Sequence, residues 1–122
     1  MRVIVCGTRG YVDNSVQYAL REALQDLWPI DEIIHGDCPN SADELASQYA
    51  HEYGIVEWAY PADWEGHGKA AGFMRNFEMA KIENVDECIA IWDGKSRGTE
   101  HMIKAAVQKG IFVRIIPASI EA

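Results

Sequence analysis

The feature that most constrains the fold is an alternation of short apolar runs with amphipathic helical patterns along the chain. Between the apolar runs, hydrophobic residues recur at the i, i+3, i+4 spacing of helices. Strands that alternate with helices favour a parallel sheet with helices on both faces. We therefore expect one α/β domain over residues 1–122, a three-layer fold with a five-stranded, mainly parallel sheet. Strands are predicted at residues 2–6, 55–60, 86–92 and 111–116, and a short strand with its exit turn at residues 32–37.

Local signals mark the ends of the first two helices. Asp13 or Ser15 can cap the first helix, and Pro29 stops it. The second helix opens on a Ser-Ala-Asp-Glu run that matches a capping box. In that arrangement Ser41 caps the backbone amide of Glu44, and the Glu44 side chain reaches back.

The helical pattern breaks over residues 61–72, where a proline, a tryptophan and glycines predict the longest irregular connection in the chain. Long loops in compact domains are often functional. The helix that follows places Phe73, Phe77 and Ala80 on one face. The last helix, from about residue 99 to residue 109, is expected to turn four residues inward: Met102, Ile103, Ala106 and Val107.

Composition narrows the class of protein. No apolar run approaches the roughly 20 residues that span a bilayer, and the N-terminal run is too short for a signal peptide. We expect a cytoplasmic protein with no membrane contact. The net charge of −8 repels a nucleic-acid backbone and disfavours a non-specific DNA or RNA binder.

Three widely spaced cysteines argue against disulfides and structural zinc. Cys6 and Cys88 lie in apolar runs and are expected to be buried as small hydrophobic residues. Cys38 lies in a polar turn. A nucleophilic role for Cys38 needs a partner base, and the sequence identifies none.

Residues with the character of binding motifs follow several predicted strands. In a parallel sheet the carboxyl ends of the strands share one edge, where ligands bind. Five cations fall in or beside these loops and suggest a compact anionic ligand, although loops also carry charge without function: Arg9, Lys69, Arg75, Lys95 and Arg97. The strand-end segments are Gly7-Thr8-Arg9, His35-Gly36-Asp37, Asp63-Trp64 and Asp93-Gly94.

The stretch 92–99 combines a strand end, a polar turn and a helix start. Free amides and the helix dipole make a helix N-terminus suitable for phosphate. Gly94 and Gly98 allow close approach of a ligand, while Ser96 and Thr99 add hydroxyl donors. Taken alone, the stretch is better explained as a capped surface turn, and only the other strand-end segments favour a phosphate site.

Other nucleotide and catalytic motifs fail. A Walker A loop needs a glycine where Ile89 stands, and GxGxxG and GxSxG are absent. Four residues at strand ends have metal-ligand chemistry, but scattered aspartates more often form Asx turns or accept ligand hydroxyls. We expect no metal and no resident cofactor. The four residues are His35, Asp37, Asp63 and Asp93.

Taken together, these residues resemble the SLOG superfamily, Rossmann-like domains that include the DprA/Smf proteins and the LOG phosphoribohydrolases. The small YspA-like branch is the most similar. The resemblance covers nearly the whole chain. It is carried by Gly7-Thr8-Arg9, His35-Gly36-Asp37 with Ala42-Asp43, Pro61-Ala62-Asp63-Trp64, Gly68-Lys69-Ala70-Ala71-Gly72, Arg75-Asn76-Phe77-Glu78-Met79 and 92–99.

The resemblance implies a nucleotide or nucleotide-derived ligand at the strand ends, with its phosphate near residues 94–99. Arg75 and Met79 match the spacing of an Arg and a Met in LOG enzymes. The glutamate of those enzymes stands three residues after the Thr, where this chain has Met102. A displaced carboxylate, Asp93 or Glu100, would have to act in its place.

Several candidates carry two interpretations each. Arg75 either contacts the phosphate, and stabilises a departing sugar phosphate, or forms a surface salt bridge. Trp64 and Trp92 either stack on a base or pack beneath a loop. His35 either titrates near the site or orients its loop.

We expect a ligand sensor or processing module for a small nucleotide-like anion. The alternative is a nucleotide N-glycosidase with Arg75, Asp93 and Glu100 as catalytic candidates. Single-stranded DNA binding is a weaker alternative, and the resemblance makes a homo-oligomer plausible. The expected ligand-binding residues are Gly7, Thr8, Arg9, His35, Gly36, Asp37, Asp63, Trp64, Lys69, Arg75, Asn76, Asp93, Gly94, Ser96, Arg97, Gly98 and Thr99.

Overall fold

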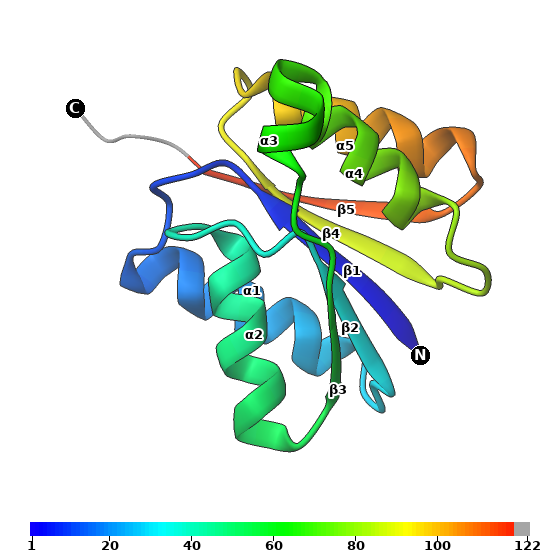
Figure 1. Cartoon of the computed structure of the whole chain (residues 1–122). Coiled ribbons are helices and arrows are strands. Elements are labelled where there is room, and N and C mark those ends of the chain that lie inside the picture. The colour runs from blue at the N-terminus through cyan, green and yellow to red at the C-terminus, as the bar shows by residue number, and fades with distance from the viewer. Residues whose placement is uncertain (119–122) are drawn as a thin grey trace.

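Five parallel strands form the sheet of the computed structural model, which describes residues 1–118 (Figure 1). No helix among these residues has the length and apolar character to cross a membrane. The strands are β1 (Arg2–Gly7), β2 (Glu32–His35), β3 (Val56–Ala59), β4 (Glu87–Trp92) and β5 (Phe112–Pro117). The helices are α1 (Asn14–Asp26), α2 (Ala42–Tyr53), α3 (Trp64–His67), the 3₁₀ turn η1 (Gly68–Ala70), α4 (Ala71–Ala80) and α5 (Arg97–Gln108).

The strand order β3-β2-β1-β4-β5 places β1 in the middle of the sheet. The chain winds outward from β1 to β3, then returns to the other side of β1 and builds β4 and β5. In open α/β sheets such a reversal leaves a crevice at the carboxyl ends of the two strands that it separates. Here the crevice lies between β1 and β4, where Gly7 is in register with Ile91. The predicted three-layer, Rossmann-like α/β fold is confirmed.

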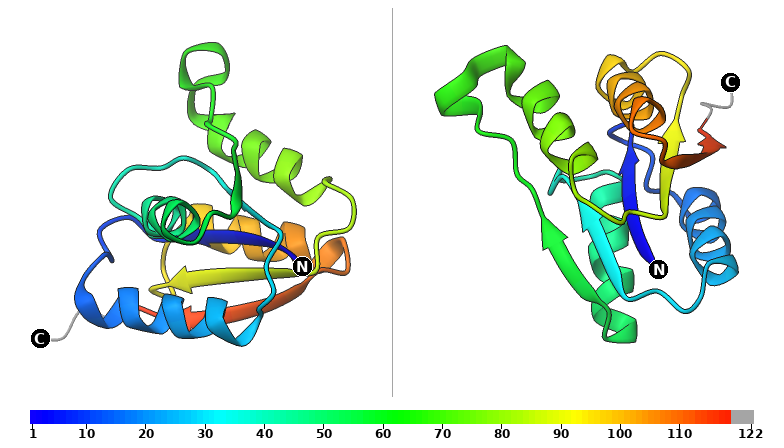
Figure 2. Two further views of the ribbon diagram at one scale, coloured as in Figure 1. Left: turned by 90° about the horizontal axis from the view of Figure 1, so that it is seen from below. Right: turned by 90° about the vertical axis from the view of Figure 1, so that its right-hand side faces the viewer.

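Helices cover both faces of the sheet, with α1 and α2 on one side and α4 and α5 on the other (Figures 1 and 2). Successive side chains of β1 pack into the two cores on opposite faces of the sheet. Val3 and Val5 pack in the core that contains α1 and α2, whereas Ile4 and Cys6 pack in the core that contains α4 and α5. A strand buried on both faces has no polar side, which explains the continuous apolar run.

Asp13 is the residue that caps α1. Its Oδ1 accepts a hydrogen bond from the Val16 amide at 3.0 Å. The other candidate, Ser15, donates its hydroxyl to Asp13 Oδ1 at 2.8 Å instead. The predicted stop before Pro29 is confirmed, since α1 ends at Asp26 and Leu27 is its C-cap.

The capping partners at the start of α2 differ from the predicted box. Ser41 Oγ accepts from the Asp43 amide at 3.1 Å, not from Glu44. The Glu44 carboxylate accepts from the Asn40 amide at 2.7 Å, outside the helix. The hydroxyl of Ser41 also donates to the Cys38 carbonyl at 2.9 Å, which ties the cap to the preceding loop.

The expectation of a long irregular connection over residues 61–72 is wrong, because α3 and η1 occupy most of it. Asp63 caps α3 by accepting a hydrogen bond from the Gly66 amide at 2.9 Å. The Trp64 ring packs over Gly72, where a Cβ would lie 3.3 Å from it. Figure 2 shows α3 projecting beyond the body of the sheet.

Phe73 and Phe77 of α4 share one face as expected, whereas the buried face of α5 differs from the expectation. Phe73 and Phe77 are exposed, and their rings flank His101 of α5 at 4.4 and 4.8 Å between centroids. Val107 is 61% exposed, contrary to the prediction, and Ala105 is buried instead. Each helical residue turns the chain by about 100°, so a face centred on Met102 and its neighbours carries Val107 outward.

Candidate functional site

A cavity of about 410 Å³ opens at the switch point of the sheet. The exit of β1, the start of α2, the α3–α4 segment and the N-terminus of α5 form its walls. Its volume lies within the range of small-molecule sites. Ten predicted ligand-binding residues line it: Gly7, Thr8, Arg9, Trp64, Lys69, Arg75, Asn76, Ser96, Gly98 and Thr99.

The other predicted site residues do not line the cavity. Most of them hold the loops that form its walls, as the contacts below describe. These residues are His35, Gly36, Asp37, Asp63, Asp93, Gly94, Arg97 and Glu100.

The turn between β4 and α5 is organised by Asp93. Its Oδ1 accepts hydrogen bonds from the amides of Ser96 and Lys95, each at 2.8 Å. These backbone hydrogen bonds hold the pKa of Asp93 below its usual value. Gly94 has a φ of +80°, which the turn requires, and the indole of Trp92 donates to the Ser96 carbonyl at 3.1 Å. Asp93 and Trp92 therefore stabilise the turn.

The N-terminus of α5 faces the cavity. Ser96 serves two of its amides: the hydroxyl accepts from Thr99 at 3.4 Å, and the carbonyl accepts from Glu100 at 3.1 Å. Among the hydrogen bonds within residues 1–118, the amides of Arg97 and Gly98 have no acceptor. An unfilled helix N-terminus attracts an anion through these amides and the helix dipole.

Arg75 reaches from α4 across the cavity wall to the loop after β2. Its guanidinium donates to the Gly36 carbonyl at 2.6 Å and to Asn76 Oδ1 at 2.9 Å. Both terminal nitrogens also lie 3.8 Å from the Cys38 sulfur. A Cβ at Gly36 would overlap the guanidinium, so this close approach requires glycine there. The interpretation of Arg75 as half of a surface salt bridge is not supported within residues 1–118.

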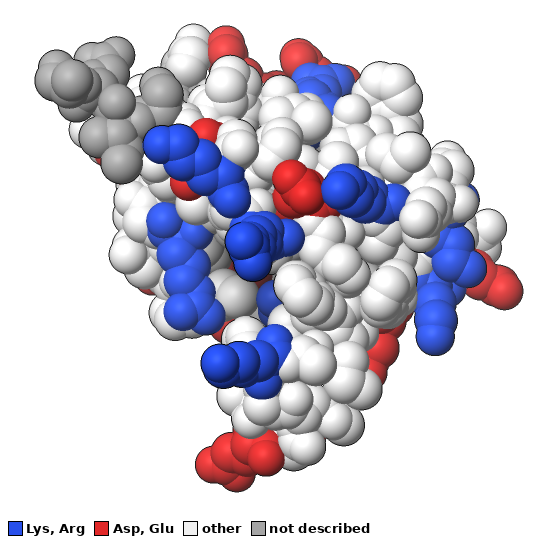
Figure 3. Space-filling model, turned by 90° about the horizontal axis from the view of Figure 1, so that it is seen from above, with Lys and Arg blue, Asp and Glu red and all other residues white. Residues whose placement is uncertain are grey.

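Cations gather around the cavity without carboxylate partners. Figure 3 views the molecule from the side of α3 and the turn before α5, and Lys and Arg side chains gather on this face. Within residues 1–118 the ion pairs involve other cations. Seven Lys and Arg residues have no ion pair within residues 1–118. Five of them lie in or beside the loops at this edge, namely Arg9, Lys69, Arg75, Lys95 and Arg97, and the other two are Lys81 and Lys109.

His35 orients its loop rather than facing the cavity. Its ring is 1% exposed, and Nε2 lies 2.6 Å from a carboxylate oxygen of Glu57. The other ring nitrogen accepts from the Asp37 amide at 3.0 Å. That hydrogen bond supports the positive φ of Asp37, at +57°. These contacts favour the interpretation that His35 orients its loop over the interpretation that it contacts the ligand.

Asn76 couples α4 to α5 at the edge of the cavity. Its amide nitrogen lies 3.1 Å from the Gly98 carbonyl and 3.3 Å from His101 Nδ1. Burial lowers the pKa of His101, which favours the neutral ring. The two helices are thus joined beside the open amides of α5.

Asp43 is the charged cavity residue that the sequence reasoning missed. It is 5% exposed, and its Oδ2 accepts from the Cys38 amide at 3.1 Å. Its Oδ1 has no hydrogen-bond partner within residues 1–118. Burial raises the pKa of this carboxyl group. The only sequence signal was its place in the Ala42-Asp43 part of the family pattern, which we interpreted as a helix start.

Cavity-lining residues that were also not predicted are mostly apolar. Phe73, Met79 and Met102 supply an apolar wall opposite the polar loops. Met102 occupies the position of the LOG-type glutamate, so a thioether stands where that family has a carboxylate. The remaining ones are Cys6, Cys38 and Gly72.

Of the three catalytic candidates, only Arg75 lines the cavity. Asp93 is occupied by backbone amides of its own turn. Glu100 is nearly half exposed and pairs with Lys104 at 3.1 Å. Neither carboxylate replaces the LOG-type glutamate in this arrangement.

All three cysteines are free thiols. Cys6 and Cys88 are buried as predicted, with their sulfurs 4.0 Å apart. Within residues 1–118 no group of three or more His, Cys, Asp or Glu side chains is placed to hold a metal ion.

Comparison with known proteins agrees with this architecture. Residues 1–67 match the family model described as the YspA, cpYpsA-related SLOG family. The chain is also similar to the Gene 61 protein of Mycobacterium phage D29, with 33% identity over 116 residues. That alignment covers 90% of this chain and 91% of the phage protein. The chain therefore belongs to the YspA, cpYpsA-related SLOG family.

Proposed function

We propose that the cavity binds a nucleotide or nucleotide-derived ligand, and that the protein is a sensor or processing module for it. Family membership is consistent with a nucleotide-related ligand. The observation that carries the proposal is the combination of an open helix N-terminus with unpaired cations in one cavity at the switch point. Such a combination suits a phosphate group.

The cavity offers complementary chemistry for the rest of a nucleotide. In the proposed complex the phosphate contacts the amide of Gly98, with Lys69 and Arg9 nearby on the cavity wall. Trp64 borders the same space and is about half exposed, so its ring is available to stack on a base. The side chains of Phe73 and Met79 offer an apolar surface for the same group.

A second candidate function is cleavage of a nucleotide N-glycosidic bond. The observation that favours it is Asp43, a cavity carboxyl group whose pKa is raised by burial. A protonated carboxyl group can donate its proton to a departing base. Water adds to C1′ of the sugar as the C1′–N bond breaks, and Arg75 stabilises the resulting sugar phosphate. Asp93 and Glu100 are engaged elsewhere and have no part in this proposal.

A thermal-shift screen with chromatography of each hit tests both candidates. The screen uses nucleoside mono-, di- and triphosphates, ADP-ribose, NAD and cyclic nucleotides. A ligand at 100 times its Kd adds roughly 2.7 kcal/mol of stability. A shift with the ligand recovered intact supports the sensor, and release of free base supports the N-glycosidase. Absence of any shift would overturn the proposal.

Single-stranded DNA provides a further arm of the screen. The net charge of −8 and a cavity of about 410 Å³ favour a small ligand over a polymer. We expect no salt-dependent binding of an oligonucleotide. Tight binding that weakens with salt would favour the DNA alternative instead.

A further inference from the structure

One wall of the cavity offers hydrogen-bond donors, and a buried, unused acceptor belongs to a residue of another wall. The acceptor is Oδ1 of Asp43, a residue that lines the cavity and is only 5% exposed. Its other oxygen already accepts from the Cys38 amide. Within residues 1–118, Oδ1 has no partner. Buried polar atoms are nearly always hydrogen-bonded, so such an atom calls for an explanation.

Arg75 does not neutralise Asp43 directly. No ion pair within 4.0 Å joins them among the pairs of residues 1–118. The guanidinium instead contacts the Cys38 sulfur and the Gly36 carbonyl. Its charge acts on Asp43 only at longer range, where it opposes the effect of burial on the carboxyl group.

Helices α2 and α5 both begin at this edge of the sheet, but the charges of their first turns differ. At the N-terminus of α2, Ser41 accepts from the Asp43 amide, and the Glu44 carboxylate accepts from the Asn40 amide before the helix. Its first turn also carries two acidic residues. An anion is therefore unfavourable at α2 and favourable at the open N-terminus of α5.

Gly7 lies between these two walls. A Cβ at this position would lie 2.8 Å from the Ala42 Cβ of α2 and 3.0 Å from the Ile91 carbonyl of β4. Gly7 and Thr8 both line the cavity, so they form its floor from α2 to the α5 side. The Thr8 hydroxyl lies 3.4 Å from that of Thr99 in α5.

We infer that Asp43 is a second pole of the binding site, which accepts a hydrogen bond from an O–H or N–H group of the ligand. This inference rests on the proposed function and fixes the orientation of the ligand. The phosphate lies at α5, and a donor group at the other end lies at α2. The ligand class is a nucleoside monophosphate whose ribose hydroxyls or base amino group supply that donor.

The first arm of the test uses the wild-type protein alone. Isothermal titration calorimetry compares AMP, GMP and CMP. The tightest of them is then compared with its 2′-deoxy form, its 3′-deoxy form and the analogue without the exocyclic amino group. We expect one analogue to bind at least tenfold more weakly. A hydroxyl analogue would identify the ribose as the donor, and the deaminated analogue would identify the base.

The second arm assigns that loss to Asp43. The Asp43→Asn variant keeps an oxygen for the Cys38 amide but replaces the free acceptor with an NH₂ group. It should bind the parent nucleotide at least tenfold more weakly than the wild type. It should bind the analogue that lacks the donor with wild-type affinity, which closes a double-mutant cycle. The matched control is Glu44→Gln, which removes the same charge from the same helical turn outside the cavity, and it should bind like the wild type.

The outcomes separate this inference from the proposed function. If the wild type binds a monophosphate but neither the analogues nor Asp43→Asn change the affinity, the role of Asp43 is wrong and nucleotide binding stands. If Asp43→Asn and Glu44→Gln lose affinity equally, the effect is one of general charge, and the inference is also wrong. If none of the three monophosphates binds the wild type, the inference is overturned, whereas the wider screen decides the proposed function.

Discussion

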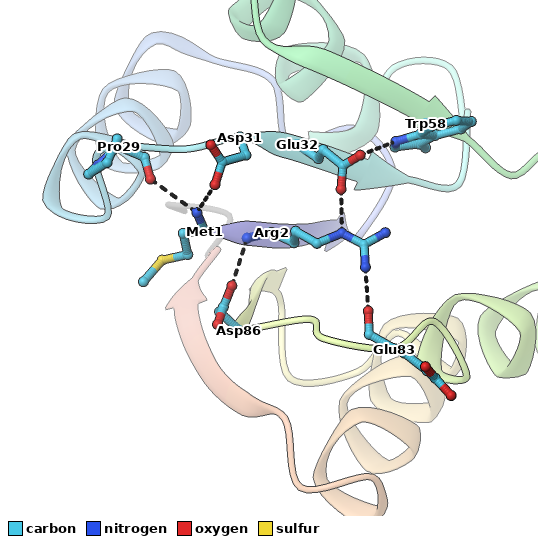
Figure 4. Close-up of polar contacts among 8 residues, drawn as sticks. All are labelled: Met1, Arg2, Pro29, Asp31, Glu32, Trp58, Glu83 and Asp86. Carbon is cyan, nitrogen blue, oxygen red and sulfur yellow. Dashed lines mark hydrogen bonds and ion pairs between the residues drawn. The ribbon is translucent and has the colours of Figure 1, made fainter.

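Arg2 at the amino end of the sheet and Arg75 at the carboxyl end are both half-buried, but within residues 1–118 only Arg2 meets a carboxylate. The Arg2 guanidinium pairs with Glu32 and donates to the Glu83 carbonyl. The second oxygen of Glu32 accepts from the Trp58 indole at 3.0 Å, as Figure 4 shows. Among the described residues, Arg75 has only a carbonyl, an amide oxygen and a thiol in hydrogen-bonding range.

This contrast separates charge that holds the fold from charge that is available to a ligand. At the amino end the Arg2 amide also donates to Asp86 at 2.8 Å, so β1 is joined there to the segment before β4 (Figure 4). A cation that is satisfied internally has little attraction left for an external anion. At the carboxyl end the five cations in or beside the strand-end loops have no ion pair within residues 1–118, although the protein as a whole is acidic.

The largest effect is expected from Gly98→Val. Gly98 lines the cavity, and a Cβ there meets no atom within 4 Å, so a side chain fills open space without disturbing the fold. Nucleotide affinity should fall at least 100-fold, which is about 2.7 kcal/mol. Calorimetric titration measures the affinity, and thermal unfolding should show an unchanged Tm. Gly98→Ala, with a smaller side chain, should lose less affinity. If Gly98→Val binds the nucleotide with wild-type affinity, the assignment of the phosphate to the N-terminus of α5 is wrong.

The next prediction compares alanine substitutions of the two arginines. Arg75→Ala should weaken nucleotide binding by roughly 10- to 100-fold, as expected for a charged hydrogen bond. Arg2→Ala should leave binding unchanged but lower the Tm by about 3–6 °C, because it removes the contacts to Glu32 and Glu83. Thermal unfolding and titration of both variants measure the two effects. The contrast fails if Arg75→Ala costs more stability than Arg2→Ala and leaves the affinity unchanged.

Two carboxyl groups at opposite ends should give opposite pH dependence. Burial raises the pKa of Asp43, so its ionisation in the folded state costs stability. That cost is absent below the unfolded pKa of about 3.9 and grows as pH rises through the folded pKa. Asp43→Asn should therefore raise the Tm by a few degrees at pH 7, and the gain should shrink towards pH 4. Thermal unfolding across this range measures the difference, and a gain that grows on acidification would contradict the prediction.

Glu32→Gln is the opposite case at the amino end. The Trp58 indole, and then Arg2, lower the pKa of Glu32. The stability that it contributes is present above its unfolded pKa and is lost as pH falls through the folded pKa. Glu32→Gln should therefore lower the Tm at pH 7 and approach the wild type in acid. Parallel pH profiles for Glu32→Gln and Asp43→Asn would remove the contrast between the two ends.

The smallest effect is expected from Glu100→Gln. Glu100 pairs with Lys104 on the exposed side of α5, away from the cavity lining. Exposed pairs of this kind contribute about 0.3–0.5 kcal/mol, so the Tm should change by no more than a degree or two. Nucleotide affinity and any base release should stay within twofold of the wild type. Loss of base release in this variant would restore Glu100 as a catalytic candidate.

Much of the fold could be predicted from sequence patterns, because strands and helices depend largely on neighbouring residues. Continuous apolar runs such as Val3-Ile4-Val5 predicted strands buried on both faces. Parallel strands then placed distant loops at one edge, and ten predicted residues do line the cavity. The errors arose where two local signals competed. Asp63 caps a short helix inside a stretch that its glycines marked as irregular.

The site could be predicted only in part, because residue type does not reveal what a side chain faces. Asp93 and His35 have suitable chemistry, but their hydrogen bonds go to neighbouring backbone and to Glu57. Asp43 has the same chemistry and was interpreted as part of a helix start. Its sequence context gave no sign that one oxygen would remain unpartnered at the cavity.

The sequence by itself determined the strand and helix order, the edge where the loops converge and the family. Each of these depends on periodicity, turn residues or motif order, which are properties of neighbouring residues. The tertiary structure alone decided which charges are satisfied. Arg2 and Arg75 look alike in sequence, and only the folded chain brings Glu32 to one and the Gly36 carbonyl to the other. Partners that lie 30 and 39 residues apart are chosen by the packing of strands and helices, which local patterns do not specify.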